Sequence, residues 1–311
     1  YWAISGFIFT QTCLDLKNYE FKKFFFTLFK RFYPLHILTL LSICMLQYTS
    51  YLFFGHTQLD FMNDFYHFLL HIFFASDWGL HQSFSFNAPV WFLSILIPVY
   101  FFAFFTIKFL KKIGIAFPIF IIILVYIINN DYQYRTILNE MQKLALFNFM
   151  QCFIYFYLGS SIYFTFKKII SLNFNHSEHF ITFLTLIGVF LSIYLLNFNN
   201  HKILNAFPAT ILLFTSLIVL FANLDYLSKF SFKKIDVLSN TSISIYLWHL
   251  PIQILILILI RYYEIDTSIL RSLNFFYFYI TMLLTISYLS YSYYEKPLSN
   301  KISFFLRNKT N

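Results

Sequence analysis

Residues 242–260 read SISIYLWHLPIQILILILI and contain no charged side chain. A helix of about 20 such residues is long enough to cross the hydrocarbon core of a bilayer. His249 and Pro251 interrupt the run. Because hydrocarbon holds no water to satisfy polar groups, polar residues within a span usually face a bundle interior or a cavity. The stretch therefore predicts a membrane-spanning helix in which His249 either lines a functional cavity or packs structurally.

The composition of the whole chain supports a membrane protein. Of its 311 residues 59% are hydrophobic and 11% are charged, and 46 are phenylalanine. A soluble protein of this size cannot hide so much apolar surface. The formal net charge of +9 does not indicate nucleic acid, because the basic residues fall in short loops between apolar runs. The 3 cysteines are too scattered for a disulfide framework or a zinc site. No metal site and no cofactor are expected.

Apolar runs of spanning length recur, and we expect an all-α, polytopic transmembrane helix bundle forming one domain over residues 1–311. The expected spans lie at roughly 30–53, 88–107, 113–129, 144–166, 179–198, 203–222, 242–260 and 272–294, with residues 1–12 as the end of another. Most Lys and Arg fall in alternate loops, namely those before the first span, at 108–112, 167–168 and 229–234, and after the last span. This bias places those loops and the C-terminus in the cytoplasm. Eight full spans and one partial span predict about ten in the intact protein, with the first ones preceding Tyr1.

The longest loop on the opposite side is residues 54–87. Its polar residues recur at helical spacing and form one narrow stripe: His56, Asp60, Asp64, His67 and His71. The pattern predicts an amphipathic helix lying at the outer membrane interface with a wetted polar face. Two alternatives remain open. Histidines four residues apart with nearby carboxylates suit a metal, and the stripe could also hydrogen-bond a polar acceptor at the outer surface.

Lys30 and Arg31 precede an apolar run as a basic pair. Such a pair is either a positive-inside anchor or a clamp for the phosphates of a cytoplasmic, nucleotide-bearing donor, because a guanidinium binds phosphate through two hydrogen bonds. Pro34 fits the first turn of a helix, where its missing N–H is harmless.

Three further residues, Trp91, Ser94 and Tyr246, are candidates for a cavity or an acceptor path. Trp91 is either an interfacial aromatic residue or part of the path, and Ser94 either bonds to its own helix or lines the path. Tyr246 is a candidate structural partner of His249 within the same run. Glu295, at the end of the last span, is expected to pair with a neighbouring cation at the interface.

Five segments, in order along the chain, resemble motifs of the integral-membrane acyltransferase 3 family of bacterial glycan O-acyltransferases. These are residues 1–10 (YWAISGFIFT), 30–35 (KRFYPL), 90–94 (VWFLS), 242–251 (SISIYLWHLP) and 295–297 (EKP). They resemble the family stretches FFVISGFLIT, RxxRIxPxY, WSLSVE, SYSLYLxHxP and ExP. Each motif is weak evidence alone, but the five occur in the family's order and are distributed along nearly the whole chain.

The chain departs from the family pattern at three places. The family carries its presumed catalytic histidine in a first span, which would precede Tyr1. Leu28 stands where the first Arg of RxxR is expected, so only Arg31 carries over, with Lys30 as a displaced charge. Leu96 stands where the WSLSVE motif has its glutamate. The catalytic residue is therefore unknown within this chain, and His249 is the remaining candidate.

The resemblance implies a multi-pass protein of the bacterial cytoplasmic membrane that transfers an acyl group, most often acetyl. The implied partners are acyl-CoA as donor, an envelope glycan or lipid-linked sugar as acceptor, and the lipid bilayer. Arg31 and Lys30 would bind the donor, and Trp91, Ser94 and Tyr246 would line the cavity. The alternatives are a transporter or flippase of lipid-linked sugars, a membrane glycan polymerase, and an inactive remnant.

Overall fold

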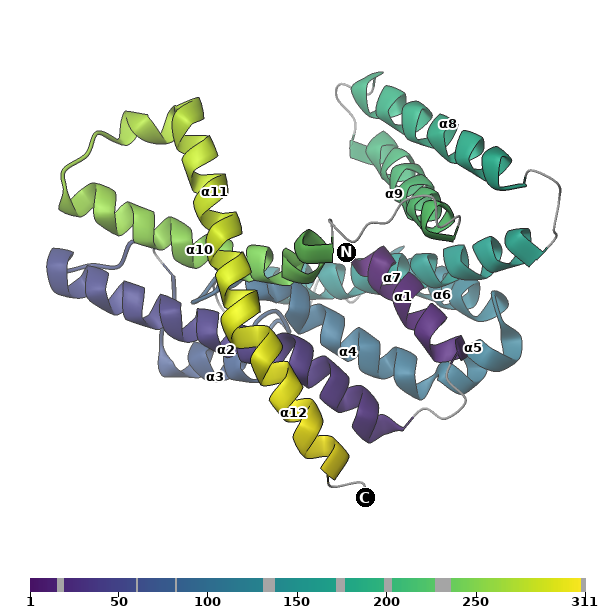
Figure 1. The fold of residues 1–311 in the computed structure, drawn as a ribbon, viewed down its shortest axis with the longest axis horizontal. Helices are drawn as coiled ribbons and strands as arrows, with labels where there is room; N and C mark the ends of the chain where they lie inside the picture. The colour runs from purple at the N-terminus through teal and green to yellow at the C-terminus, as the bar shows by residue number, and fades with distance from the viewer. Residues whose placement is uncertain are drawn as a thin grey trace. The chain divides into compact units, whose positions relative to one another are not determined.

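The computed structural model describes residues 1–15, 20–59, 61–81, 83–130, 138–171, 177–198, 203–226 and 236–308. These residues form helices and connecting turns, and no strand occurs among them, which confirms the all-α prediction (Figure 1). The α-helices are α1 (Trp2–Asp15), α2 (Phe21–Phe54), α3 (Phe65–Ile72), α4 (Trp91–Phe105), α5 (Ile107–Ile113), α6 (Ala116–Asn130), α7 (Glu140–Ser171), α8 (Ser177–Phe198), α9 (Ile203–Tyr226), α10 (Asp236–Tyr262), α11 (Leu273–Ser290) and α12 (Lys296–Asn308).

Every expected span corresponds to helical structure, but the number of spans stays a prediction. Among the described residues, 5 helices are long and apolar enough to cross a membrane, or 6 if a bent pair counts as one span. That pair consists of Ile107–Ile113 and Ala116–Asn129, which meet at 119°. The apolar segments described in α8 and α9 are shorter, at Ile181–Leu195 and Ile211–Asn223.

The chain divides into two compact units. Unit 1 comprises residues 1–18, 99–137 and 147–232, and unit 2 comprises residues 19–98, 138–146 and 233–311. α4 and α7 each contribute to both units, so the division does not follow the helix boundaries. The expected single domain over residues 1–311 stays a prediction.

In unit 1, α1 packs closely on α7 through two glycines. A Cβ atom at Gly6 would lie 1.8 Å from the carbonyl oxygen of Phe156, and one at Gly159 would lie 1.8 Å from that of Ala3. Small residues allow such backbone contact between membrane helices, where dispersion rather than water exclusion drives packing. Beside the glycines, Thr10 Oγ1 donates to Ser160 Oγ at 2.8 Å. α8 and α9 lie side by side in the same unit (Figure 1).

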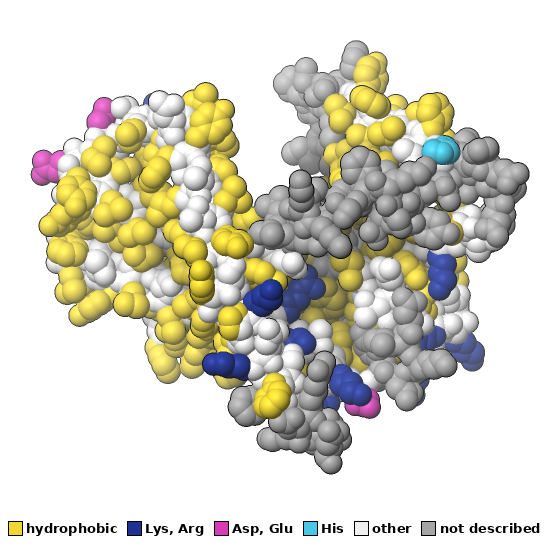
Figure 2. Space-filling model, in the orientation of Figure 1, with side chains coloured by type: hydrophobic (Ala, Val, Ile, Leu, Met, Phe, Trp, Pro, Cys, Tyr) yellow, Lys and Arg dark blue, Asp and Glu magenta, His cyan; other side chains and the backbone are white. Residues whose placement is uncertain are grey.

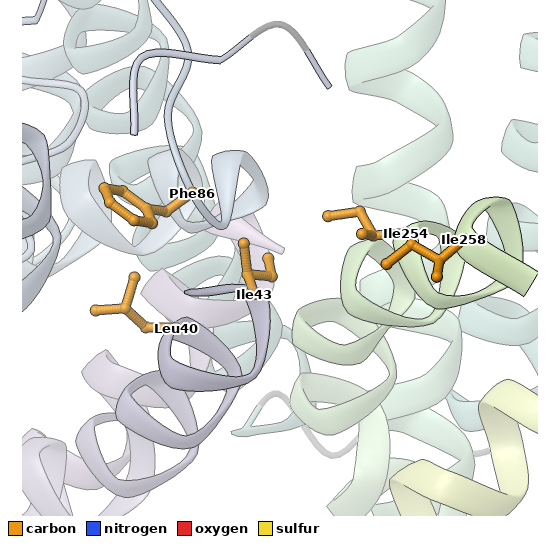
Figure 3. Packing of buried hydrophobic residues seen from close by; sticks show 5 residues of the cluster. All are labelled: Leu40, Ile43, Phe86, Ile254 and Ile258. Carbon is orange, nitrogen blue, oxygen red and sulfur yellow. The ribbon is translucent and has the colours of Figure 1, made fainter. Parts of the chain in front are cut away.

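In unit 2, α10 packs between α2 and α11. Figure 3 shows the buried cluster that α2 and α10 share, formed by Leu40, Ile43, Phe86, Ile254 and Ile258. A second cluster joins α10 to α11. α11 continues through a π-helical turn, η5 (Tyr291–Glu295), into α12 (Figure 1).

Pro34 does not lie in the first turn of its helix, as the sequence suggested, because α2 begins at Phe21. Proline inside a helix removes one backbone hydrogen bond. The early start extends α2 well before the apolar run, so Lys30 and Arg31 lie on the helix rather than in a loop.

The contact between α1 and α7 can be tested at Gly159. Replacing glycine by alanine inside a helix favours the helix by about 0.8–1.0 kcal/mol, whereas the clash with the Ala3 carbonyl costs about 1–3 kcal/mol. We expect Gly159→Ala to lower the thermal denaturation midpoint of the purified protein. Thr165→Ala, at an exposed position of α7, is the control and should change it little. A raised midpoint in Gly159→Ala would contradict this packing.

Candidate functional site

A cavity of about 540 Å³ lies in unit 2 between α2, α10, η5 and α12. Three of its lining side chains are basic, namely Lys30, Arg31 and Lys296. The other lining residues are Thr27, Asn240, Ile243, Tyr291, Glu295, Ser299 and Asn300. In Figure 2, Lys and Arg side chains gather over the first part of α2 and over α12, whereas the surface over α10 and α11 is mostly apolar. We call this space the basic cavity.

The basic side chains of this cavity are available to an anion. No salt bridge joins Lys30, Arg31 or Lys296 to a carboxylate within the described part of the chain. Lys30 Nζ donates to Ser303 Oγ at 3.1 Å, and the Arg31 guanidinium lies 5.4 Å from the centre of the Phe32 ring. The structure thus brings the two predicted donor-binding residues together and adds Lys296, because α12 returns to the beginning of α2.

Glu295 is held by hydroxyl groups rather than by a cation. Its Oε1 accepts hydrogen bonds from Ser244 Oγ at 2.8 Å and from Ser290 Oγ at 2.9 Å. Among the described residues no cation pairs with Glu295, so the expected pairing with a neighbouring cation is not found there. Ser244 is fully buried on α10, and η5 turns the carboxylate toward it. The carboxylate thereby fixes η5 against α10 at one wall of the basic cavity.

Tyr246 and His249 lie on α10 but do not line the basic cavity. Tyr246 OH donates to the carbonyl oxygen of Pro89 at 2.7 Å and so joins α10 to the turn before α4. His249 donates from Nδ1 to the Tyr246 carbonyl, and its ring centre lies 5.7 Å from that of Tyr246. His249 O accepts from Tyr279 OH on α11 at 3.3 Å. Tyr246 and His249 are thus partly buried, and their contacts join α10 to the neighbouring segments.

Ser94 anchors the 54–87 loop instead of bonding to its own helix. Its Oγ accepts from the backbone N–H of Asp77 at 3.0 Å, and its carbonyl oxygen accepts from Trp78 Nε1 at 2.9 Å. Trp91, one turn earlier, lines a small pocket beneath that loop. Both predicted acceptor-path residues therefore lie at the loop, away from the basic cavity.

The polar stripe of the 54–87 loop is wetted only in part: His56 and Asp64 are exposed, whereas His67 and His71 are buried, contrary to the expected wetted face. The helix spans only Phe65–Ile72, with Asp64 as its N-cap, and His56 lies before it. His67 is 3% exposed and His71 is 1% exposed, whereas Phe65 is 74% exposed. Of the predicted apolar face, Phe65 points outward, whereas Phe68 and Ile72 pack against the cluster that contains Leu40 and Ile43. Asp60 lies outside the described residues, and the location of this helix at a membrane interface stays a prediction.

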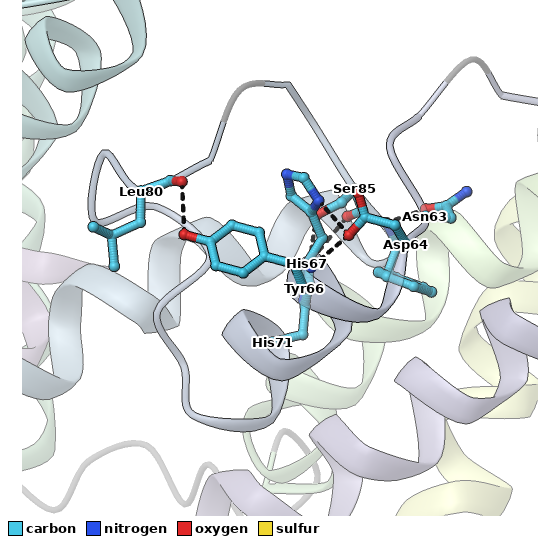
Figure 4. Close-up of polar contacts among 8 residues, drawn as sticks. Asn63, Asp64, Tyr66, His67, His71, Leu80 and Ser85 are labelled. Carbon is cyan, nitrogen blue, oxygen red and sulfur yellow. Dashed lines mark hydrogen bonds and ion pairs between the residues drawn. The ribbon is translucent and has the colours of Figure 1, made fainter.

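Each of the buried histidines His36, His67 and His71 hydrogen-bonds to a neighbouring group, and Figure 4 shows the contacts of His67 and His71. His36 Nε2, on α2, donates to the carbonyl oxygen of His71 at 2.8 Å, and His71 Nε2 donates to that of Ser85 at 3.0 Å. His67 Nδ1 lies 2.8 Å from Asp64 Oδ1. Burial lowers the pKa of His71 to about 3, so this imidazole is neutral near pH 7. The sequence analysis did not single out His36, which stands alone in an apolar run.

The loop also contains a pair of residues, Asp77 and His81, that was not predicted from the sequence. His81 Nε2 lies 3.7 Å from Asp77 Oδ1, and each side chain is 3% exposed. A carboxylate four residues before a histidine was the available signal, but the loop around it has no helical period. Among the described residues, no three His, Cys, Asp or Glu side chains are arranged to hold a metal ion.

The low pKa of His71 has a consequence for stability. The unfolded chain takes up a proton below the ordinary value of 6.5 while folded His71 does not, so stability falls as pH drops from about 6.5 toward 3. We expect His71→Gln, which keeps a donor toward Ser85, to reduce the fall in the thermal midpoint between neutral and acid pH. His71→Ala should lower the midpoint at neutral pH by leaving Ser85 O without its donor. Identical pH profiles for the wild type and His71→Gln would contradict this.

The comparisons with known proteins agree with the sequence motifs. The family model described as an acyltransferase domain (Acyl_transf_3) matches residues 1–292 of the chain. Comparison with curated proteins and with solved structures finds no match. The matched region includes α1 to α11 and the beginning of η5, and the helices are those of a multi-pass membrane protein. The chain belongs to the acyltransferase 3 family.

Proposed function

We propose that this membrane acyltransferase transfers an acyl group, most often acetyl, from cytoplasmic acyl-CoA to a hydroxyl of a cell-envelope glycan or lipid-linked sugar. We place it in the bacterial cytoplasmic membrane with its C-terminus in the cytoplasm. The observation that supports this most is the basic cavity, in which Lys30, Arg31 and Lys296 converge from α2 and α12.

The basic cavity suits the nucleotide end of CoA. Its volume of about 540 Å³ lies within the range of ligand pockets, about 300–1,000 Å³. Three basic side chains against one carboxylate favour a ligand with several phosphates. The Glu295 carboxylate is turned toward Ser244 and Ser290, which reduces its repulsion of such a ligand. Asn240 and Asn300 add amide groups that can hydrogen-bond a base or a sugar.

The reaction needs a group that removes the proton of the acceptor hydroxyl. The alkoxide oxygen then forms a bond to the thioester carbonyl carbon, the carbon–sulfur bond breaks, and the CoA thiolate leaves and takes up a proton. The resemblance implies that this base is a histidine. Within this chain His249 stays the candidate, although its Nδ1 is engaged by the Tyr246 carbonyl.

A transporter or flippase of lipid-linked sugars is the second candidate function. The 119° break between α5 and α6 favours it, because transporters bind substrate at interrupted helices. Vesicles containing the intact protein, radiolabelled acetyl-CoA and envelope glycan distinguish the two. Label in the glycan supports acyl transfer, whereas sugar translocation without label supports transport.

Arg31 is the most direct test of the donor site. A charge-assisted hydrogen bond contributes about 1.5–3 kcal/mol, so Arg31→Ala should raise the apparent KM for acetyl-CoA about tenfold or more. Arg31→Lys should recover part of this, because an ammonium keeps the charge but loses the bidentate geometry.

Lys296→Ala and Lys301→Ala form a matched pair on α12. Lys296 lines the basic cavity and exposed Lys301 does not, yet each replacement removes one charge. We expect a higher donor KM only in Lys296→Ala. An unchanged KM in Arg31→Ala and Lys296→Ala would remove the phosphate-binding role of this cavity.

A further inference from the structure

A small pocket beneath the 54–87 loop combines several polar residues with the apolar residues Phe84 and Ala88. It is lined by the side chains of His71, Ser76, Asp77 and His81, together with Ser85 and Trp91. Its free volume of about 10 Å³ corresponds to roughly one water molecule. The pocket lies within unit 2, as the basic cavity does, but the two share no lining residue.

The pocket presents hydrogen-bond acceptors that the protein does not use. A carbonyl oxygen only accepts, so His71 carries its proton on Nε2 toward Ser85 O, and Nδ1 is a bare acceptor. The carboxylate of Asp77 lies 3.7 Å from Nε2 of His81, and its charge favours a proton on that nitrogen. Neither Nδ1 atom has a hydrogen-bond partner among the described residues, and the same holds for Ser76 Oγ.

The loop around the pocket is held rigidly. Its backbone is bonded to Ser94 at Asp77, and Tyr66 OH donates to Leu80 O at 3.0 Å. Phe74 and Phe86, at the two ends of this segment, have positive φ angles of 54° and 39°. Positive φ is strained for bulky residues and persists only where surrounding contacts impose it, often at functional sites.

The chemistry of the walls selects the ligand. A bare imidazole nitrogen requires a hydrogen-bond donor, and one hydroxyl hydrogen can serve one of the two nitrogens, while the Ser76 hydroxyl can also use an acceptor. A hydroxyl group supplies both functions, whereas an ammonium only donates and an anion would meet the Asp77 carboxylate. An unpartnered buried acceptor is unfavourable because it has lost its hydrogen bonds to water, and a hydroxyl in this pocket would restore one of them.

We propose that this pocket receives one hydroxyl group of a sugar, the acyl acceptor, and that His81, held by Asp77, accepts the hydrogen bond from it. This inference rests on the proposed transfer to a glycan hydroxyl and names its recognition site. His81 is thereby a specificity-determining residue, and Asp77 is a positioning residue that fixes the tautomer of His81. The role of Ser94 is to hold Asp77.

The test uses the intact protein in lipid vesicles, radiolabelled acetyl-CoA, and methyl β-glucoside and methyl N-acetyl-β-glucosaminide as probe acceptors. His81→Phe keeps a ring but removes the acceptor, whereas His81→Asn keeps an oxygen near the Nδ1 position. Tyr66→Phe, which loosens the loop at Leu80 outside the pocket, is the control for a purely structural effect. Two measurements are made: steady-state kinetics for both substrates, and amide hydrogen exchange of residues 74–86 with and without glycoside.

We expect His81→Phe to raise the KM for the glycoside about tenfold, equivalent to one lost hydrogen bond, with the donor KM unchanged. His81→Asn should remain within about threefold of the wild type. Glycoside should slow exchange in residues 74–86 of the wild type and Tyr66→Phe but not of His81→Phe.

The outcomes separate this inference from the proposed function. Acyl transfer with an unchanged glycoside KM in His81→Phe would overturn the inference alone and leave the pocket as a site for structural water. Protection of residues 74–86 without transfer would support the pocket and count against the proposed function. Absence of protection by either glycoside in the wild type would overturn the inference whatever the transfer result.

Discussion

The side-chain amide of Asn87 joins two helices of unit 2, and the arrangement of the candidate site depends on it. Fully buried Asn87 donates from Nδ2 to Thr39 Oγ1 of α2 at 3.0 Å and to the Leu247 carbonyl of α10 at 3.2 Å. Two residues later, Pro89 accepts from Tyr246. Apolar side chains gain little by leaving lipid for another helix, whereas an unsatisfied amide in an apolar interior costs several kcal/mol. Polar contacts therefore set the crossing of these segments, and the apolar clusters fill in around them.

Because of this crossing, α2 contributes to both proposed binding sites, the basic cavity for the donor and the small pocket for the acceptor hydroxyl. Arg31 lines the basic cavity, and His36 donates to the carbonyl oxygen of His71, which lines the small pocket. Five residues separate them, about 7.5 Å along the helix axis. A donor held by its phosphates at Arg31 and a hydroxyl held near His81 would thus be positioned by one continuous helix. The Glu295 contacts with Ser244 and Ser290 fix the remaining wall of the basic cavity in the same unit.

The helices could be predicted from the sequence because their signal is local. Long apolar runs and alternating Lys/Arg loops depend only on the nearby chain, and α2, α7, α10 and α11 lie where these signals place them. Contacts between distant segments carry no such signal. The π-helical turn η5 brings Lys296 near Arg31 and turns Glu295 toward Ser244. No pattern in the sequence predicted this turn. The helical stripe through His67 and His71 was correct in period. The contacts of His71 with His36 and Ser85, which bury this part of the stripe, join distant segments and could not be predicted from the period.

The departure from the family motif at Leu96 has a physical counterpart in the loop. The resemblance places a glutamate at this position, but Leu96 is 2% exposed in an apolar environment, where an unpaired carboxylate would be costly. Ser94, two residues earlier, accepts a hydrogen bond from the backbone N–H of Asp77. That contact brings a different carboxylate, beside His81, to the beginning of the same helix. We interpret Asp77 of the loop as the acidic group that this chain has in place of the glutamate of the family motif. In the loop the Asp77 carboxylate lies next to His81, which reduces the cost of burying the charge. The charge in turn orients the His81 imidazole, and both residues line the small pocket.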